Sequence, residues 1–103
     1  MQRTHKASEL NTESVGQKVK LCGWINTRRD HGGLIFIDLR DRSGLIQIVF
    51  SPEVDEESFH LAEKVRSEYV IAVSGTVAAR TPATINPNLS TGDIEVFIDQ
   101  MEV

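Results

Sequence analysis

The sequence predicts an all-β domain with one helix, in which five strands close into a small barrel. Five segments alternate apolar and polar residues with the period of two that is typical of half-buried strands. One further segment, between the third and fourth strands, repeats its apolar residues at helical spacing. The chain has 103 residues, of which 40% are hydrophobic, and a single cysteine. That length supports one modest core, and Cys22 by itself excludes an intramolecular disulfide framework.

The first three strands follow one another closely. The first is expected at residues 18–25, where Gly23 indicates a bulge or a sharp bend of the kind that small barrels need. Residues 30–33 follow as a turn, because paired glycines accept positive φ at little steric cost. The second strand is expected at residues 34–40 and the third at 45–50, with a hairpin turn at 41–44 between them.

The helix and the last two strands complete the order of elements. Residues 51–55 are expected to begin the helix, because proline suits a first turn and acidic residues favour the positive end of the helix dipole. Phe59, Ala62 and Val65 then recur at near-helical spacing, so the helix is predicted to continue to about residue 67. The last strands are expected at 69–77 and at about 93–101, and a long polar loop at 81–91 separates them.

Three strands, a helix and two further strands form the order of an OB-fold, a five-stranded Greek-key barrel with the helix between strands 3 and 4. Ligands bind an OB-fold on strands 2 and 3, between the loop joining strands 1 and 2 and the loop joining strands 4 and 5. We therefore treat residues 1–103 as a single OB-fold domain with a short N-terminal extension over about residues 1–15.

The charge distribution favours one half of the domain for binding anions. The formal net charge of −4 argues mildly against a nucleic-acid binder, but the distribution of charge matters more than its sum. Residues 17–42 include six basic and three acidic side chains, whereas residues 53–68 include two basic and six acidic ones. Two ordinary solvated faces would give the same counts. If the domain has an anion-binding face, the asymmetry places it on the first half of the chain.

Phe36 is the most informative candidate for ligand binding. If Ile35 and Ile37 face the core, Phe36 faces outward, and an aromatic ring beside charge is a stacking platform for a nucleic-acid base. Gln47 on the third strand shares this face, where its amide can bind the edge of an unpaired base. The other candidates are Arg28, Arg29 and His31 at the loop between strands 1 and 2, Thr84 and Asn86 in the long loop, and Glu95 on the last strand.

Each candidate also has an ordinary structural interpretation. An exposed Phe is often covered by a loop, and glutamines, arginine pairs and glutamates are most often solvated. Trp24 suits a supporting role in the barrel or against a neighbouring domain. The three histidines have no metal-ligand spacing with Cys22, and the sequence has neither a glycine-rich phosphate loop nor a nucleophile with a nearby base. We therefore expect no catalytic residue, cofactor or metal in this domain.

Several segments resemble the N-terminal anticodon-binding domain of bacterial aspartyl-tRNA synthetases. They are LCGWIN at 21–26, RRDHGGLIFIDLRDR at 28–42, GLIQ at 44–47, VSGTV at 73–77, INP at 85–87 and TGDIEV at 91–96. The resemblance extends from about residue 3 to residue 103. The related lysyl and asparaginyl enzymes share the fold but lack the run at 28–42.

The resemblance implies specific roles in reading the anticodon GUC. In that family, the residue at the position of Phe36 stacks on an anticodon base, and the residue at the position of Gln47 reads the middle uracil. Arg29 matches a residue that contacts the third base, and Glu95 matches the acid that recognises the first. Asn86 keeps its place in the loop between strands 4 and 5, whereas TPAT at 81–84 departs from the more polar stretch of some relatives.

The resemblance also implies that this chain is a fragment of a larger class II enzyme. The full-length enzyme attaches aspartate to its tRNA through an aspartyl-adenylate, using ATP and Mg²⁺ in a separate catalytic domain. We expect the full protein to be a cytoplasmic homodimer and the isolated domain to be a monomer without membrane contacts, since no apolar run has membrane-spanning length. Two alternatives remain: a general single-stranded nucleic-acid-binding OB module, and a protein-interaction barrel that uses Trp24, Phe97 or the acidic helix.

Overall fold

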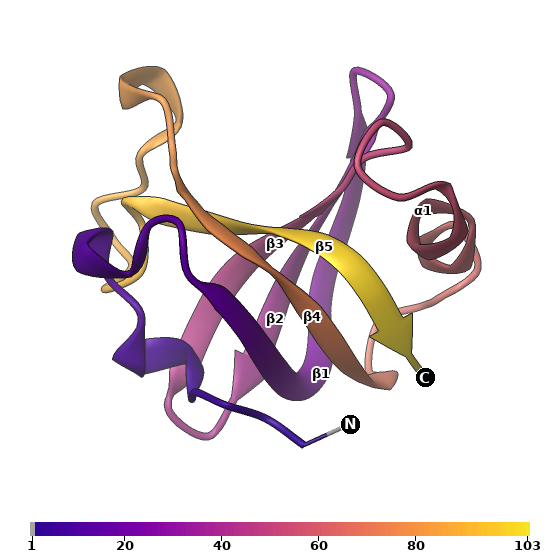
Figure 1. Cartoon of the computed structure of the whole chain (residues 1–103), viewed down its shortest axis with the longest axis horizontal. Helices are drawn as coiled ribbons and strands as arrows, with labels where there is room; N and C mark the ends of the chain where they lie inside the picture. Colours follow the sequence, from indigo (N-terminus) through magenta and orange to yellow (C-terminus); the bar gives the residue numbers. More distant parts are fainter. Residues whose placement is uncertain (1) are drawn as a thin grey trace.

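The computed structural model describes residues 2–103, which form a closed five-stranded barrel in the order β1–β2–β3–β5–β4 (Figure 1). Its elements are η1 (Ala7–Glu9), η2 (Thr12–Ser14), β1 (Lys18–His31), β2 (Leu34–Asp41), β3 (Gly44–Phe50), α1 (Glu56–Ala62), β4 (Val70–Ala79), η3 (Pro82–Thr84) and β5 (Ile94–Glu102). Neighbouring strands are antiparallel except β3 and β5, which are parallel. The predicted OB-fold is confirmed, including the helix between β3 and β4.

The long strand β1 bends so that it belongs to both sides of the barrel. Its first half pairs with β4 as far as Trp24, and its second half pairs with β2 from Trp24 onward. Gly23 lies at this change of partner, and a Cβ atom there would lie 2.3 Å from the carbonyl oxygen of Arg40. Only glycine therefore allows β1 and β2 to approach so closely, which confirms the bend predicted at Gly23.

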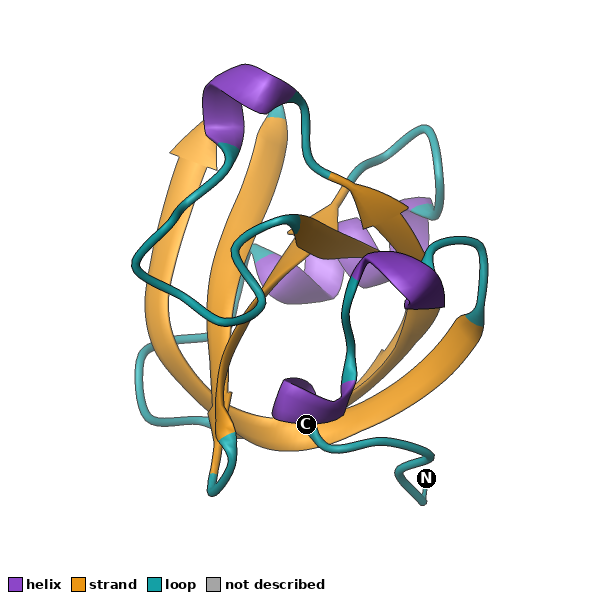
Figure 2. Cartoon of the chain, turned by 90° about the vertical axis from the view of Figure 1, so that its left-hand side faces the viewer, coloured by secondary structure: helices purple, strands orange, loops and turns teal. Residues whose placement is uncertain are grey.

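The core follows the predicted alternation of side chains. Ile35, Ile37 and Leu39 of β2 are at most 2% exposed, whereas Leu34 and Phe36 on the other face are half-buried. The N-terminal residues Ala7 and Leu10 also join the core, and the short helices η1 and η2 lie across one opening of the barrel (Figure 2). The residues predicted as an extension thus close one end of the barrel.

The helix is shorter than predicted, because tertiary hydrogen bonds take over the chain after it. It begins after Asp55, whose carboxylate accepts a 2.8 Å hydrogen bond from the Ser58 backbone N–H, and it ends at Ala62 instead of about residue 67. The chain then turns back to β1, where the Glu68 N–H donates to the Ile25 carbonyl and the Ile25 N–H donates to the Tyr69 carbonyl. These bonds tie residues 68 and 69 to β1, and the segment between Ala62 and β4 runs as turns and not as helix.

The turn between β1 and β2 is also tighter than predicted. β1 continues to His31, and Gly32 and Gly33 alone make the connection, with φ of 61° and 81°. Arg28, Arg29 and His31 therefore lie on a strand and not in a loop, and the prediction that placed them in the loop was wrong. The paired glycines supply the positive φ values that such a short turn requires. No helix formed by residues 2–103 is long and apolar enough to cross a membrane.

Candidate nucleic-acid interface

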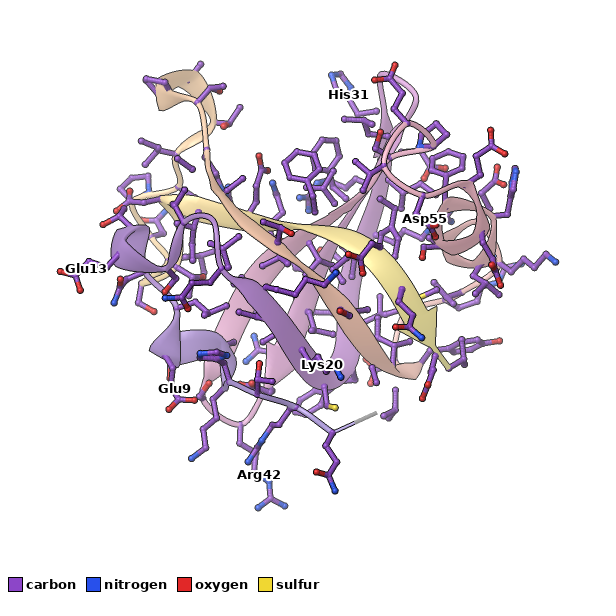
Figure 3. The ribbon with its side chains drawn as sticks, in the orientation of Figure 1. Glu9, Glu13, Lys20, His31, Arg42 and Asp55 are labelled. Atoms are coloured by element: carbon purple, nitrogen blue, oxygen red, sulfur yellow. The ribbon has the colours of Figure 1, made fainter. Side chains whose placement is uncertain are left out.

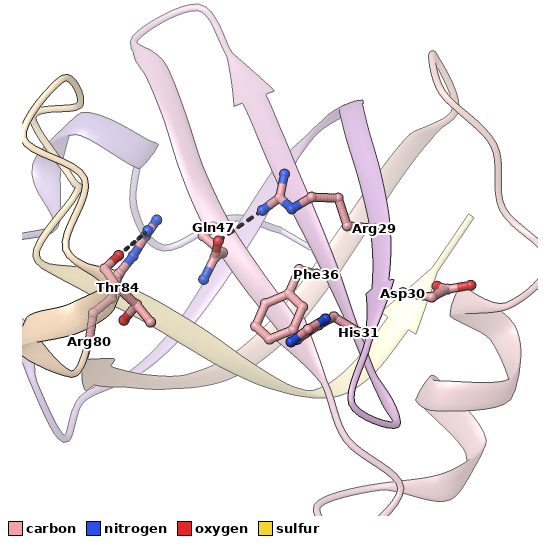
Figure 4. A pocket seen from close by; sticks show the side chains of 7 residues that line it. All are labelled: Arg29, Asp30, His31, Phe36, Gln47, Arg80 and Thr84. Atoms are coloured by element: carbon pink, nitrogen blue, oxygen red, sulfur yellow. Dashed lines mark hydrogen bonds between the residues drawn. The ribbon is translucent and has the colours of Figure 1, made fainter.

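A cavity of about 590 Å³ opens on the outer surface of the barrel, between the β1–β2 hairpin and the loop that follows β4. Its lining residues are Arg29, Asp30, His31, Phe36, Gln47, Arg80 and Thr84 (Figure 4). In Figure 4, Arg80 and Thr84 lie on one side of Gln47, and Phe36 and His31 lie on the other. The cavity coincides with the ligand face that the OB-fold order predicts.

Strand register determines which side chains meet in this cavity. Arg29 of β1 is the cross-strand partner of Phe36 on β2, and Asp38 of β2 is the partner of Gln47 on β3. Paired residues point to the same side of a sheet, so these four side chains share the outer face. Three neighbouring strands therefore build most of the cavity wall, and the backbone fixes their side-chain directions.

A continuous chain of hydrogen bonds runs across the three strands and on to β5. Thr27 Oγ1 donates to Asp38 Oδ2 at 2.7 Å, and Arg29 Nη1 donates to the same oxygen at 3.1 Å. Arg29 Nη2 donates to Gln47 Oε1 at 3.0 Å. Gln47 Nε2 donates in turn to Glu95 Oε1 at 2.8 Å. Because Asp38 and Gln47 hold both ends of its guanidinium, Arg29 is fixed in place although it is an exposed residue.

Gln47 is more enclosed than a solvated surface amide. Only 6% of the residue is exposed, and both ends of its amide have charged partners. This arrangement fixes the orientation of the amide, with its oxygen toward Arg29 and its nitrogen toward Glu95. One N–H and one lone pair of the oxygen are not engaged by these two partners, which leaves a donor and an acceptor for a ligand. Such a pair is complementary to the hydrogen-bonding edge of a nucleobase.

Phe36 provides the apolar part of the cavity. Phe36 is half-buried on the outer face of β2, and its ring does not stack on another aromatic side chain of residues 2–103. His31 lies beside it at the end of the hairpin (Figure 4). A flat ring next to a donor–acceptor amide and a held guanidinium is able to stack on a base and bind its edge at the same time.

The remaining predicted residues lie at or beyond the margins of the cavity. Glu95 reaches it through Gln47. Arg28 does not line the cavity; its Nη2 lies 3.2 Å from Asp30 Oδ1, and its buried Nε has no hydrogen-bond partner. Asn86 does not line the cavity either, since its side-chain oxygen accepts a 3.0 Å hydrogen bond from the Asn88 N–H within the loop. The structure thus gathers the predicted residues Phe36, Gln47, Arg29, His31, Thr84 and Glu95, and it leaves Arg28 and Asn86 outside the cavity.

Arg80 and Asp38 are important residues that the sequence did not single out for this cavity. Arg80 directly follows β4 and is 8% exposed, and an isolated arginine before a loop gives no sequence signal of burial. Asp38 pairs with Arg29, and this ion pair positions a side chain of the cavity wall. Among residues 2–103, no three His, Cys, Asp or Glu side chains gather in a metal-binding arrangement.

Comparisons with known proteins agree with this geometry. A family model described as an OB-fold nucleic acid binding domain, the tRNA anticodon family, matches residues 19–103. An aspartate–tRNA(Asp/Asn) ligase of Syntrophomonas wolfei is 65% identical over all of this chain, and an aspartate–tRNA ligase of Geobacillus kaustophilus is 53% identical over the same length. The chain spans 18% of the length of each of these two enzymes.

A solved structure agrees at the level of the fold and of the sequence. The asparaginyl-tRNA synthetase of Pyrococcus horikoshii, in complex with asparaginyl-adenylate, superposes with a TM-score of 0.83 and 32% identity, over all of this chain and 22% of that one. Together with the family model and the cavity, this likeness identifies the domain. The chain belongs to the tRNA anticodon family of OB-fold nucleic-acid-binding domains.

Proposed function

We propose that this domain recognises the anticodon loop of a tRNA, as part of an aspartate–tRNA ligase. The observation that carries the proposal is the placement of an aromatic ring, a fixed amide and a held guanidinium around one cavity of about 590 Å³. An anticodon is single-stranded, so its bases are free to turn outward and be read on their hydrogen-bonding edges. The curated relatives support this assignment, because they are aspartate–tRNA ligases.

The residues divide the work of recognition. Phe36 stacks on one anticodon base, a contact that tolerates many bases and contributes about 1–3 kcal/mol. Gln47 selects the middle uracil by pairing its free N–H and carbonyl oxygen with the complementary edge of the base. Arg29 contacts the third base, and Glu95 contacts the first, where a carboxylate accepts from amino or imino groups. Arg28, His31 and Asn86 contact the anticodon loop around this centre.

The whole protein that contains this domain extends beyond it. We propose a class II ligase that attaches aspartate to tRNA in a separate catalytic domain, with ATP and Mg²⁺ as its cofactors. Some relatives are named as ligases for both the aspartate and the asparagine tRNA, and others as aspartate–tRNA ligases alone. We propose that the third anticodon base is where the enzyme distinguishes these two tRNAs. We propose that the protein is a cytoplasmic homodimer and that the isolated domain is monomeric.

Chemical-shift mapping of the isolated domain tests the proposal. An anticodon stem-loop carrying GUC is titrated, with the same stem carrying a scrambled loop and a poly-pyrimidine DNA as matched controls. We expect preferential binding of the GUC loop, with shifts at Phe36, Gln47 and Arg29. Equal binding of the DNA would support a general single-stranded nucleic-acid binder, and shifts confined to α1 would support a protein-interaction barrel. The domain alone is expected to form no aminoacyl-tRNA in a charging assay.

A further inference from the structure

Arg80 differs from the other cation of the cavity wall in having no acidic partner. Its Nε donates to the Ile94 carbonyl at 3.0 Å, and its Nη1 donates to the Thr84 carbonyl at 3.0 Å. Among residues 2–103 its Nη2 group has no hydrogen-bond partner and no carboxylate pairs with the guanidinium. Arg29, by contrast, is paired with Asp38 and is an exposed residue.

The burial of Arg80 makes this difference significant. The residue is 8% exposed, and a buried charge is costly unless an opposite charge or a full set of hydrogen bonds compensates it. Two neutral carbonyl oxygens satisfy only part of a guanidinium, which has five N–H donors. The same two bonds hold the group rigidly, because Ile94 begins β5 and Thr84 ends η3. Arg80 is therefore a pre-positioned positive charge on the wall of the cavity.

We propose that Arg80 binds one phosphodiester group of the RNA strand whose bases enter the cavity, a proposal that rests on the function proposed above. Phe36 lies across Gln47 from Arg80 (Figure 4), so a base stacked on Phe36 would leave the Arg80 side of the cavity to the RNA backbone. The backbone of the strand provides the negative charge that Arg80 lacks. Guanidinium groups bind phosphate through two parallel charge-assisted hydrogen bonds, and the free Nη2 group supplies donors for such a contact.

A ligand-side experiment tests this contact directly. The GUC stem-loop is made with one neutral methylphosphonate linkage at a time, which removes the charge of a single phosphate. We expect one linkage in the loop to weaken binding to the wild-type domain about tenfold, the effect of losing a hydrogen bond between charged groups. In the wild type, the Arg80 Nε–H resonance should shift with the unmodified loop and not with that modified loop. If no linkage has this paired effect, the proposal is wrong.

Protein variants separate a phosphate contact from a purely structural role. Arg80→Gln should weaken binding of the unmodified loop, and its affinity should no longer depend on the critical methylphosphonate. The slope of log binding constant against log salt concentration should be smaller by about 0.7–1. Arg80→Lys keeps the charge and should keep part of the sensitivity. Arg42→Gln makes the same charge change at the end of the molecule opposite His31 (Figure 3), and it should retain the full sensitivity. A variant Arg80→Gln that remains as sensitive as the wild type would show that Arg80 only holds the loop.

The two proposals fail in different ways. If the wild-type domain binds a scrambled loop as tightly as GUC, the proposed function is wrong. If it prefers GUC but no methylphosphonate couples to Arg80, anticodon recognition stands and the phosphate contact alone is excluded.

Discussion

The guanidinium of Arg29 and the amide of Gln47, which are 18 residues apart in the sequence, are joined by a 3.0 Å hydrogen bond on the outer face of the barrel. The bond fixes which end of the amide faces β1. Glu95 fixes the other end from β5, through a hydrogen bond of 2.8 Å. Gln47 therefore presents a defined donor and a defined acceptor to the cavity before any ligand arrives, which lowers the entropic cost of reading a base.

Replacing Phe36 with alanine should weaken binding of the GUC stem-loop by about 1–3 kcal/mol, the value of one base–aromatic stack. The ring is half-buried on the outer face of β2 and outside the barrel core, so the fold should persist. Stem-loop titration and thermal unfolding measure the two effects. Tyr69→Ala removes an exposed aromatic side chain that does not line the cavity, and it should leave affinity unchanged. An unaltered titration for Phe36→Ala would exclude stacking.

Asp38 should act on the RNA only through Arg29. Asp38→Asn removes the charge that holds Arg29 Nη1, so the guanidinium gains freedom and stem-loop affinity falls. A double-mutant cycle with Arg29→Ala measures the coupling, for which we expect about 0.5–3 kcal/mol. Asp38→Asn should have little further effect once Arg29 is absent. Additive losses from the two substitutions would mean that Asp38 acts independently of Arg29.

Glu95 should determine how well the middle base is discriminated. In Glu95→Gln the new amide is able to donate as well as accept, so it no longer fixes the orientation of the Gln47 amide. The ratio of dissociation constants for GCC and GUC stem-loops should therefore fall. A bidentate base contact supplies about 1–3 kcal/mol of discrimination, which is the upper limit of the expected loss. Glu53→Gln changes the net charge equally at an exposed position and serves as the control. A ratio that stays at the wild-type value in Glu95→Gln would remove this positioning role.

Asp41 should make stability depend on pH at the end of the barrel that η1 closes. Burial raises the pKa of Asp41, but hydrogen bonds from Ser43, Ala7 and Gly44 together outweigh burial and hold that pKa below its ordinary value of 3.8. A lowered pKa in the folded state means that the ionised carboxylate stabilises the fold above pH 3.8 and that this contribution is lost as the pH falls through the folded-state pKa.

The substitution Asp41→Asn tests this dependence. At pH 7 the variant should unfold at lower denaturant concentration than the wild type, and the difference should shrink as the pH falls below 3.8. The exposed residue Glu13 provides the control Glu13→Gln, for which we expect little difference at either pH. A difference between wild type and Asp41→Asn that stays constant down to acidic pH would contradict the prediction.

The sequence predicted the fold and the direction of Phe36 because both depend on local periodicity. Side chains of a strand alternate between two faces, so Ile35 and Ile37 in the core place Phe36 outside. The bend at Gly23 is likewise a local consequence of a residue without a side chain. Element ends were less predictable. The helix stops at Ala62, and from Glu68 onward the chain hydrogen-bonds to β1, a strand far away in the sequence.

The sequence by itself determined which side chains lie on the outer face of each strand, because that alternation is a property of the extended backbone. Only the tertiary structure decided which of them touch. β3 and β5 pair in parallel through Ile48 and Val96, and this non-local register brings Glu95 to Gln47 across 48 residues. The burial of Arg80 likewise depends on Thr84 and Ile94 meeting around it. Barrel closure sets these distances, and no periodicity within one segment encodes them.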